Sequence, residues 1–153
     1  MERVWDYPRP PALVPCERRV RIELGGVVIA DSTTAFRVLE TSHPPTIYVP
    51  PGDFAPGALT RGQGRSLCEW KGQAHYLDLH GGDKTAERAG WAYANPVPAF
   101  AALKDHVCVY PSRVDACFLD EERVQAQEGD FYGGWITADI EGPFKGGPGT
   151  WGW

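Results

Sequence analysis

The chain has 153 residues and a net charge of −5, so it is the size of one domain and too acidic to bind a nucleic-acid duplex through clustered Lys and Arg. Its local basic cluster, Arg18, Arg19 and Arg21, is expected to form a solvated strand face. The 18 glycines, 14 prolines and 12% aromatic residues favour short strands and tight turns over a helical bundle. No window approaches the ~20 apolar residues that cross a bilayer, and the start lacks a signal-peptide core. We expect a mainly β, cytoplasmic protein with no nucleic-acid or membrane partner.

The spacing of proline and glycine divides the chain into three predicted segments: a proline-rich arm over residues 1–17, a core domain over residues 18–119 and an extension over residues 120–153. Proline cannot donate a backbone hydrogen bond, so the arm is expected to lie extended across the surface without regular ladder bonds. The extension ends in a glycine- and tryptophan-rich tail, Phe131 to Trp153. Its regularly placed rings predict that this tail docks on the core or on a second copy.

The first strands of the core follow from alternation of apolar and polar residues. Val20, Ile22 and Leu24 share one face of a strand that a Gly-Gly turn returns as a hairpin. In the next strand, Phe36 to Glu40, alternation places two apolar residues on one face and Arg37 with a leucine on the other. Paired prolines follow, so Glu40 stands where this strand becomes a loop.

The central stretch, Ser66 to Asn95, follows a glycine-rich loop expected at Thr60 to Arg65. Glycines mark a turn or bulge after Lys71 and a hairpin turn before the return strand. Pro98 and the alanines after it predict a single short helix over Ala99 to Lys104. The strands predicted in the second half of the core are Ser66–Trp70, Gln73–His80, Thr85–Tyr93, Val107–Tyr110 and Arg113–Leu119.

Cys68 is the first candidate for chemistry. A reactive thiol needs a nearby cation or base, which Lys71, His75 or His80 can supply. Such an arrangement predicts a thiol-dependent enzyme with Cys68 as nucleophile or redox centre. The alternative is a small buried hydrophobic residue, a common role for free cysteine.

Polar and aromatic residues at strand ends and bulges form the second candidate. Glu40 and Lys71 can meet at the mouth of a β domain and orient a polar ligand. Rings with polar tips suit the lining of a small-molecule pocket, although they suit a hydrophobic core equally well. The predicted ligand-binding residues are Glu40, Tyr48, Lys71, Tyr76, Trp91 and Tyr93.

No spacing of the four cysteines or four histidines matches a metal site. The sequence also lacks a Gly-Lys-Ser/Thr phosphate loop, a dinucleotide fingerprint and a Gly-x-Ser-x-Gly elbow. We therefore expect neither a metal nor a cofactor.

Five runs in order, VVIADSTTAFRVLE, PPTIYVPPGD, LCEWKGQAHY, AGWAYANPVP and VCVYPSRVD, resemble a bacterial family known as domain of unknown function family 427. The resemblance covers about Arg19 to Asp115 and implies a β-tent, in which two antiparallel sheets meet at an angle around a cleft. Relatives of that fold often hold zinc with paired Cys-x-x-Cys, which this chain lacks. The family's nucleotidyltransferase-like label finds no matching motif here. The family motifs fall on Glu40, Pro45, Tyr48, Cys68, Lys71, Gly72, Trp91, Tyr93, Tyr110 and Pro111.

Three functions follow as expectations. The first is a β domain that binds a small polar or aromatic ligand in an aromatic-lined cleft between sheets. The second is the thiol-dependent enzyme. The third is a protein-interaction or homo-oligomerisation module that uses the C-terminal tail.

Overall fold

A computed structural model of the chain describes residues 1–68, 71–127 and 133–144, with the side chains of all but residues 66–68. The predicted mainly β fold is confirmed, and in this part of the chain no helix reaches seven residues. No helix there is long and apolar enough to span a membrane. The predicted rings Trp70, Phe131, Trp151 and Trp153 lie outside the described residues.

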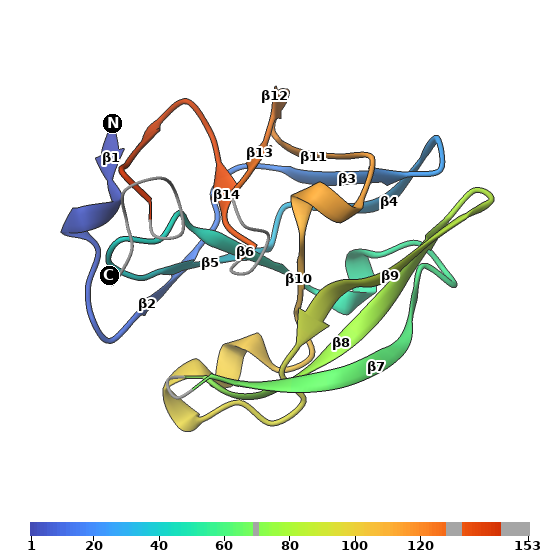
Figure 1. Ribbon diagram of the computed structural model, residues 1–153, viewed down its shortest axis with the longest axis horizontal. Coiled ribbons are helices and arrows are strands. Elements are labelled where there is room, and N and C mark those ends of the chain that lie inside the picture. Colours follow the sequence, from blue (N-terminus) through green and yellow to red (C-terminus); the bar gives the residue numbers. More distant parts are fainter. Residues whose placement is uncertain (69–70, 128–132, 145–153) are drawn as a thin grey trace.

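A seven-stranded antiparallel sheet with the order β2-β5-β6-β10-β9-β8-β7 forms the larger layer (Figure 1). These strands are rich in β-branched and aromatic residues, which pack well on a pleated, half-buried surface. Its strands are β2 (Ala12–Pro15), β5 (Phe36–Leu39), β6 (Thr46–Val49), β10 (Val107–Val109), β9 (Lys84–Ala92), β8 (Gly72–Gly81) and β7 (Leu59–Cys68).

A four-stranded antiparallel sheet, β12-β11-β3-β4, forms the second layer. Two short pairings form separate two-stranded sheets: β1 with β15, near the two ends of the described chain, and β13 with β14. The bounds are β3 (Val20–Leu24), β4 (Val27–Ser32), β11 (Ala116–Leu119), β12 (Glu122–Arg123), β1 (Glu2–Arg3), β13 (Gln125–Ala126), β14 (Trp135–Ile136) and β15 (Ile140–Glu141).

The main hydrophobic core lies between these two sheets. Val20, Ile22 and Leu24 all point into it from β3, which confirms the predicted alternation. Ile47 and Val49 of β6 meet them from the larger sheet. Each inward side chain is followed by one that points outward, so a strand of five residues buries three.

The tips of two hairpins bring the sheets into direct backbone contact. Gly25 lies against Gly81 and Gly82, and Figure 1 shows the β3–β4 and β8–β9 turns side by side. A Cβ on Gly81 would lie 2.3 Å from the carbonyl oxygen of Leu24. Only glycine allows this approach, because any side chain would occupy the neighbouring backbone.

The opposite face of the seven-stranded sheet buries a second hydrophobic cluster. The 3-10 helix η3 (Pro98–Leu103) covers it with Phe100 and Leu103, so the predicted short helix is present in the tighter helical form. Three further single 3-10 turns are present: η1 (Val4–Asp6), η2 (Pro51–Asp53) and η4 (Pro111–Arg113).

Two predicted loops belong to strands. The arm was expected to make no ladder bonds, but β2 pairs with β5 at the edge of the sheet. This is possible because an edge strand needs hydrogen bonds on one side only and tolerates proline on the other. The predicted loop Thr60 to Arg65 lies within β7, where the glycines accommodate a bulge between Arg61 and Arg65.

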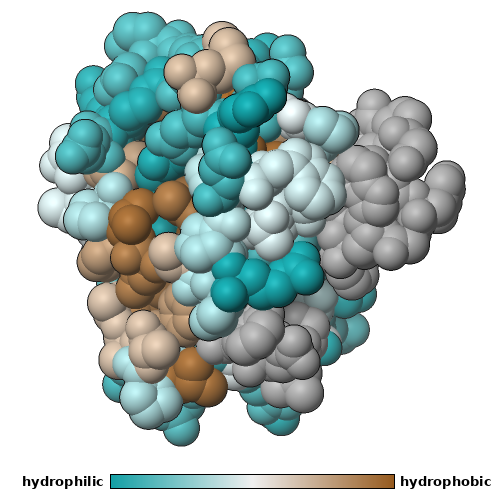
Figure 2. All heavy atoms as spheres, turned by 90° about the vertical axis from the view of Figure 1, so that its left-hand side faces the viewer, coloured by the Kyte–Doolittle hydropathy of each residue, from teal (hydrophilic) through white to brown (hydrophobic). Residues whose placement is uncertain are grey.

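The described part of the C-terminal extension contacts the core. Trp135 is buried and donates its indole N–H to the carbonyl oxygen of Val109 at 2.9 Å. Glu2 and Arg3 of β1 pair in parallel with Ile140 and Glu141 of β15. The face of the molecule that carries β1 and β2 is mostly hydrophilic, with an apolar strip along one side (Figure 2).

Gly81→Ala is expected to lower the free energy of unfolding by about 1–3 kcal/mol, because the added methyl forces the two hairpins apart. Gly52→Ala is the control, since a Cβ there meets nothing within 4 Å. Urea denaturation followed by circular dichroism measures both. Equal stability of the two variants would contradict this packing.

Candidate functional site

The predicted aromatic residues come together on the second face of the seven-stranded sheet. Registry between neighbouring strands aligns one side chain from each of five strands in a single row. Residues directly opposite in an antiparallel pair share a face, so the row is continuous. In order across the sheet, its members are Phe36, Tyr48, Cys108, Trp91 and Tyr76.

The central rings of this cluster are buried and contact one another, whereas Phe36 and Tyr76 at the two ends of the row are half-buried. Trp91 Nε1 donates to the hydroxyl of Tyr48 at 3.1 Å, with the two rings edge to face. Tyr93 lies 6.2 Å from Tyr48, and Tyr110 lies 4.8 Å from Trp91, between ring centroids. Burial raises the pKa of Tyr48 well above its usual value. These contacts are those of a core, and a ligand-binding role for the rings stays a prediction.

Lys71 is the one predicted site residue whose charge is buried in this cluster. Only 8% of its surface is exposed, and Nζ lies 5.9 Å from the centroid of the Phe100 ring. Within the described residues its ammonium forms no hydrogen bond and no ion pair. Buried charges are normally paired, so Lys71 is an unusual group for a core.

Glu40 and Lys71 do not meet. Glu40 follows the end of β5, whereas Lys71 precedes the start of β8. Three strands separate β5 from β8 in the antiparallel sheet, so β5 and β8 run in the same direction. The end of β5 and the start of β8 therefore lie at opposite ends of the strands. The predicted contact between Glu40 and Lys71 is therefore absent. It could not be ruled out from the sequence, because the sequence does not show in which direction each strand runs.

The side chain of Cys68 lies outside the described residues; its backbone pairs with Gly72 in the β7–β8 ladder. Both ring nitrogens of His80, one of its predicted bases, bond to hydroxyls of Thr60 and Thr85, at 2.7 and 3.0 Å. The other three cysteines, Cys16, Cys108 and Cys117, are buried thiols. Burial raises the pKa of each of them above its usual value.

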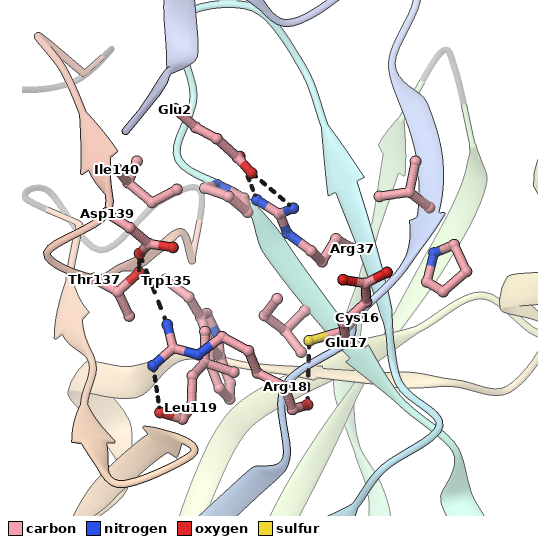
Figure 3. A pocket seen from close by; sticks show the side chains of 14 residues that line it. Glu2, Cys16, Glu17, Arg18, Arg37, Leu119, Trp135, Thr137, Asp139 and Ile140 are labelled. Atoms are coloured by element: carbon pink, nitrogen blue, oxygen red, sulfur yellow. Dashed lines mark hydrogen bonds and ion pairs between the residues drawn. The ribbon is translucent and has the colours of Figure 1, made fainter.

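A cavity of about 400 Å³ opens on the other face of the sheet, and Figure 3 shows the side chains that line it. Strands β2, β5 and β6 form one wall, and the segment that contains β14 and β15 forms the other. Its lining residues are Glu2, Val14, Pro15, Cys16, Glu17, Arg18, Arg37, Pro45, Ile47, Leu119, Trp135, Thr137, Asp139 and Ile140.

Arg37 points into this cavity because Phe36 and Val38 on either side of it face the second cluster, as alternation predicted. Its two terminal nitrogens donate to the two carboxylate oxygens of Glu2, at 2.6 and 3.3 Å. Burial opposes the charge of Arg37, but the paired carboxylate outweighs it and raises the pKa of Arg37. The hydroxyl of Tyr7 also donates to Glu2, at 2.6 Å.

Arg18 lines the same cavity but is fully engaged in holding the fold. Its guanidinium donates to Asp120 at 3.0 Å, to Glu122 at 3.2 Å and to the carbonyl oxygen of Leu119 at 2.8 Å. Its third nitrogen lies 3.7 Å from Asp139. Arg18 therefore ties the start of β3 to the β11–β12 turn and to the C-terminal segment.

Acceptor groups gather on the wall across from Arg37. The hydroxyl of Thr137 donates to Asp139, and this hydrogen bond is the main reason that the pKa of Asp139 lies below its usual value. Cys16 and Glu17 follow β2 on the same wall as Arg37; the thiol of Cys16 donates to the carbonyl oxygen of Arg18 at 3.5 Å, and Glu17 is exposed at the rim. A guanidinium on one wall and the carboxylate of Asp139 on the other can hold a small polar molecule by both of its ends.

This cavity was not predicted from the sequence. Arg18 was expected on a solvated strand face, and alternation placed Arg37 only on the strand face opposite Phe36 and Val38. The feature of the sequence that could have indicated the cavity is Arg37 itself. It stands between two apolar residues of one strand, so that strand buries apolar side chains on one face and presents a charged group on the other. Its partners come from the two ends of the described chain, which no local pattern connects.

In the described part of the chain, no group of three or more His, Cys, Asp or Glu side chains is close enough together to hold a metal ion. The expectations of no metal and no cofactor stay predictions.

Fold and cavity define a mainly antiparallel β domain with a charged cavity between its layers. The chain belongs to the family described as Domain of unknown function (DUF427), which matches residues 12–120. This match confirms the resemblance seen in the five sequence runs and extends it to β2 and to the end of β11. No curated protein matches the sequence. The β-tent geometry implied by the resemblance stays a prediction.

Lys71→Met is expected to raise the free energy of unfolding by about 1–3 kcal/mol, because methionine fills the same space without a buried charge. Lys104→Met, at an exposed lysine, is the control and should leave stability unchanged. Thermal unfolding measures both. A lower melting temperature for Lys71→Met would mean that the folded protein stabilises the ammonium.

Glu2→Gln is expected to lower the melting temperature by about 1–3 °C at pH 7, since the exposed carboxylate makes a modest ion pair with Arg37. Arg37 lowers the pKa of Glu2 from its ordinary 4.5, so the wild-type advantage is complete above that pH and fades as the pH falls below it. Melting curves at pH 7 and pH 3 test this. A difference that persists unchanged at pH 3 would contradict the assignment.

Proposed function

We propose that the protein is a binding domain for a small polar molecule, which it holds in the charged cavity between its layers. One observation supports this above all: a cavity of about 400 Å³ that is lined by two guanidiniums, a thiol, a hydroxyl and three carboxylates. Apolar walls from Ile47 and Trp135 complete it. This mixture of a few polar groups on an apolar frame is typical of small-ligand sites.

The size and construction of the cavity favour binding of a small molecule over a macromolecule. About 400 Å³ lies within the usual range of ligand pockets, about 300–1,000 Å³. Strands β5 and β6 carry one wall, and both are paired on each side within the sheet. Groups on paired strands keep their positions, which limits the entropy lost when a ligand binds.

The aromatic cluster is a second candidate location for the same function. The buried ammonium of Lys71 favours it, because an anionic ligand group would supply the partner that the described residues do not. Tyr48, Trp91 and Tyr93 would then form the floor of the predicted aromatic-lined site. The side chain of Cys68 and the tail beyond residue 144 lie outside the described residues, so the thiol-dependent reaction and the interaction module stay predictions.

A thermal-shift screen against amino acids, carboxylates, nucleosides, amines and cyclic imides tests the proposal. We expect at least one class to raise the melting temperature of the wild type in a saturable way. The same compound should fail with Glu17→Trp, because an indole at the exposed rim closes the cavity. Val28→Trp places the same ring on exposed β4, away from the cavity, and should leave the response intact.

Three outcomes separate the possibilities. No response from any class would overturn the binding function. A response that survives Glu17→Trp but is lost in Lys71→Met would move the site to the aromatic cluster. A response that survives both variants would exclude both locations.

A further inference from the structure

We propose that the cavity takes a small carboxylate that also carries an amine or hydroxyl group, with Arg37 as the anchor of the carboxylate and Glu2 as an internal competitor for that anchor. The inference rests on the proposed function and names the ligand class of the same cavity. It starts from the Glu2–Arg37 contact, in which a carboxylate already occupies the fork of the guanidinium (Figure 3).

The contact has the two-point geometry that arginine uses to recognise a free carboxylate. Nη1 and Nη2 of Arg37 each donate to a different oxygen of Glu2. A planar fork of this kind matches carboxylate more closely than a lysine ammonium does, because its donors are fixed in one plane. The fork is therefore preorganised for an acid group, whether that group belongs to Glu2 or to a ligand.

Glu2 approaches the fork from the solvent side. Its side chain is 45% exposed, whereas that of Arg37 is 21% exposed. β1 contains two residues, both exposed, and is held by a two-residue pairing with β15. Segments with so few buried contacts open at low free-energy cost.

The chain immediately after β1 is firmly held, so Glu2 can turn away without wider unfolding. Val4 is fully buried, and its carbonyl oxygen accepts hydrogen bonds from Tyr7 and Ser42. The indole N–H of Trp5 donates to the carbonyl oxygen of Pro143 at 2.7 Å. The Tyr7 hydroxyl steadies Glu2 on Arg37 and thereby strengthens the competitor.

The rest of the cavity specifies the other end of the ligand. Arg18 is committed to four partners, which leaves Arg37 as the guanidinium that a ligand can claim among the described lining residues. Asp139 and Glu17 offer carboxylate oxygens that accept from an amine or a hydroxyl. A molecule with an acid at one end and a donor at the other therefore matches the cavity better than a plain anion does.

A ligand can bind only those molecules in which Arg37 is free of Glu2. The apparent affinity for the ligand is therefore the intrinsic affinity multiplied by the fraction of molecules in that state. Removing the competitor should therefore tighten binding without adding any contact to the ligand. A purely structural ion pair would show no such coupling.

The test uses the full chain and NMR titration of the Arg37 side-chain Nε–H signal, which Arg37→Lys identifies by its loss. The probes are propionate, its neutral analogue propionamide, and β-alanine, which adds an amine. We expect propionate to bind and propionamide not to, with β-alanine binding more tightly than propionate. Glu2→Gln should tighten propionate binding about fivefold and Tyr7→Phe by less. Arg37→Lys, followed through the backbone amide signals of the residues that line the cavity, should abolish it.

Glu141→Gln is the matched control, because it removes an equal charge from β15 without touching Arg37. Equal affinities in wild type, Glu2→Gln and Glu141→Gln would overturn the competitor role. Binding of propionamide as strong as that of propionate would overturn the carboxylate class, although the screen could still support the binding function. Failure of the whole screen would remove the proposed function itself. Should Arg37→Lys not fold, the Glu2 and Tyr7 variants still decide the question.

Discussion

The seven-stranded sheet is apolar on both faces, and the rest of the molecule is arranged to cover it. On one face, β3, β4 and β11 supply the second layer and meet the sheet most closely at Gly25 and Gly81. On the other face, η3 covers the aromatic row. Away from the glycine contact, the cavity lies between β2, β5 and β6 of the larger sheet and the segments around β1, β14 and β15.

The two arginines of the cavity illustrate different uses of the same group. Arg18 has four partners that come from two separate segments, so it contributes to the fold and has little capacity left for a ligand. Arg37 has one carboxylate partner, and that partner is nearly half exposed. Exposed ion pairs contribute little to stability. The two-point geometry of the Arg37 pair is therefore compatible with the proposed recognition of a carboxylate at little cost to the fold.

Lys71 raises a separate point about the aromatic cluster. The rings satisfy one another through edge-to-face contacts and the Trp91–Tyr48 hydrogen bond, as a core requires. A lysine with 8% exposure and no counter-charge among the described residues does not belong to that pattern. Groups that lower stability without an evident structural benefit are often retained for function. The cluster and the cavity lie on opposite faces of the sheet, so the two can be tested independently.

The sequence by itself determined the mainly β class, the hairpin at Gly25-Gly26, the inward set Val20, Ile22 and Leu24, and the opposed faces of Phe36 and Arg37. These features are local, because strand alternation and glycine turns depend on neighbouring residues. Only the tertiary structure decided that Glu40 and Lys71 lie at opposite ends of the strands and that Arg37 meets Glu2. Such contacts depend on strand order and direction, which bring together residues that no local pattern relates.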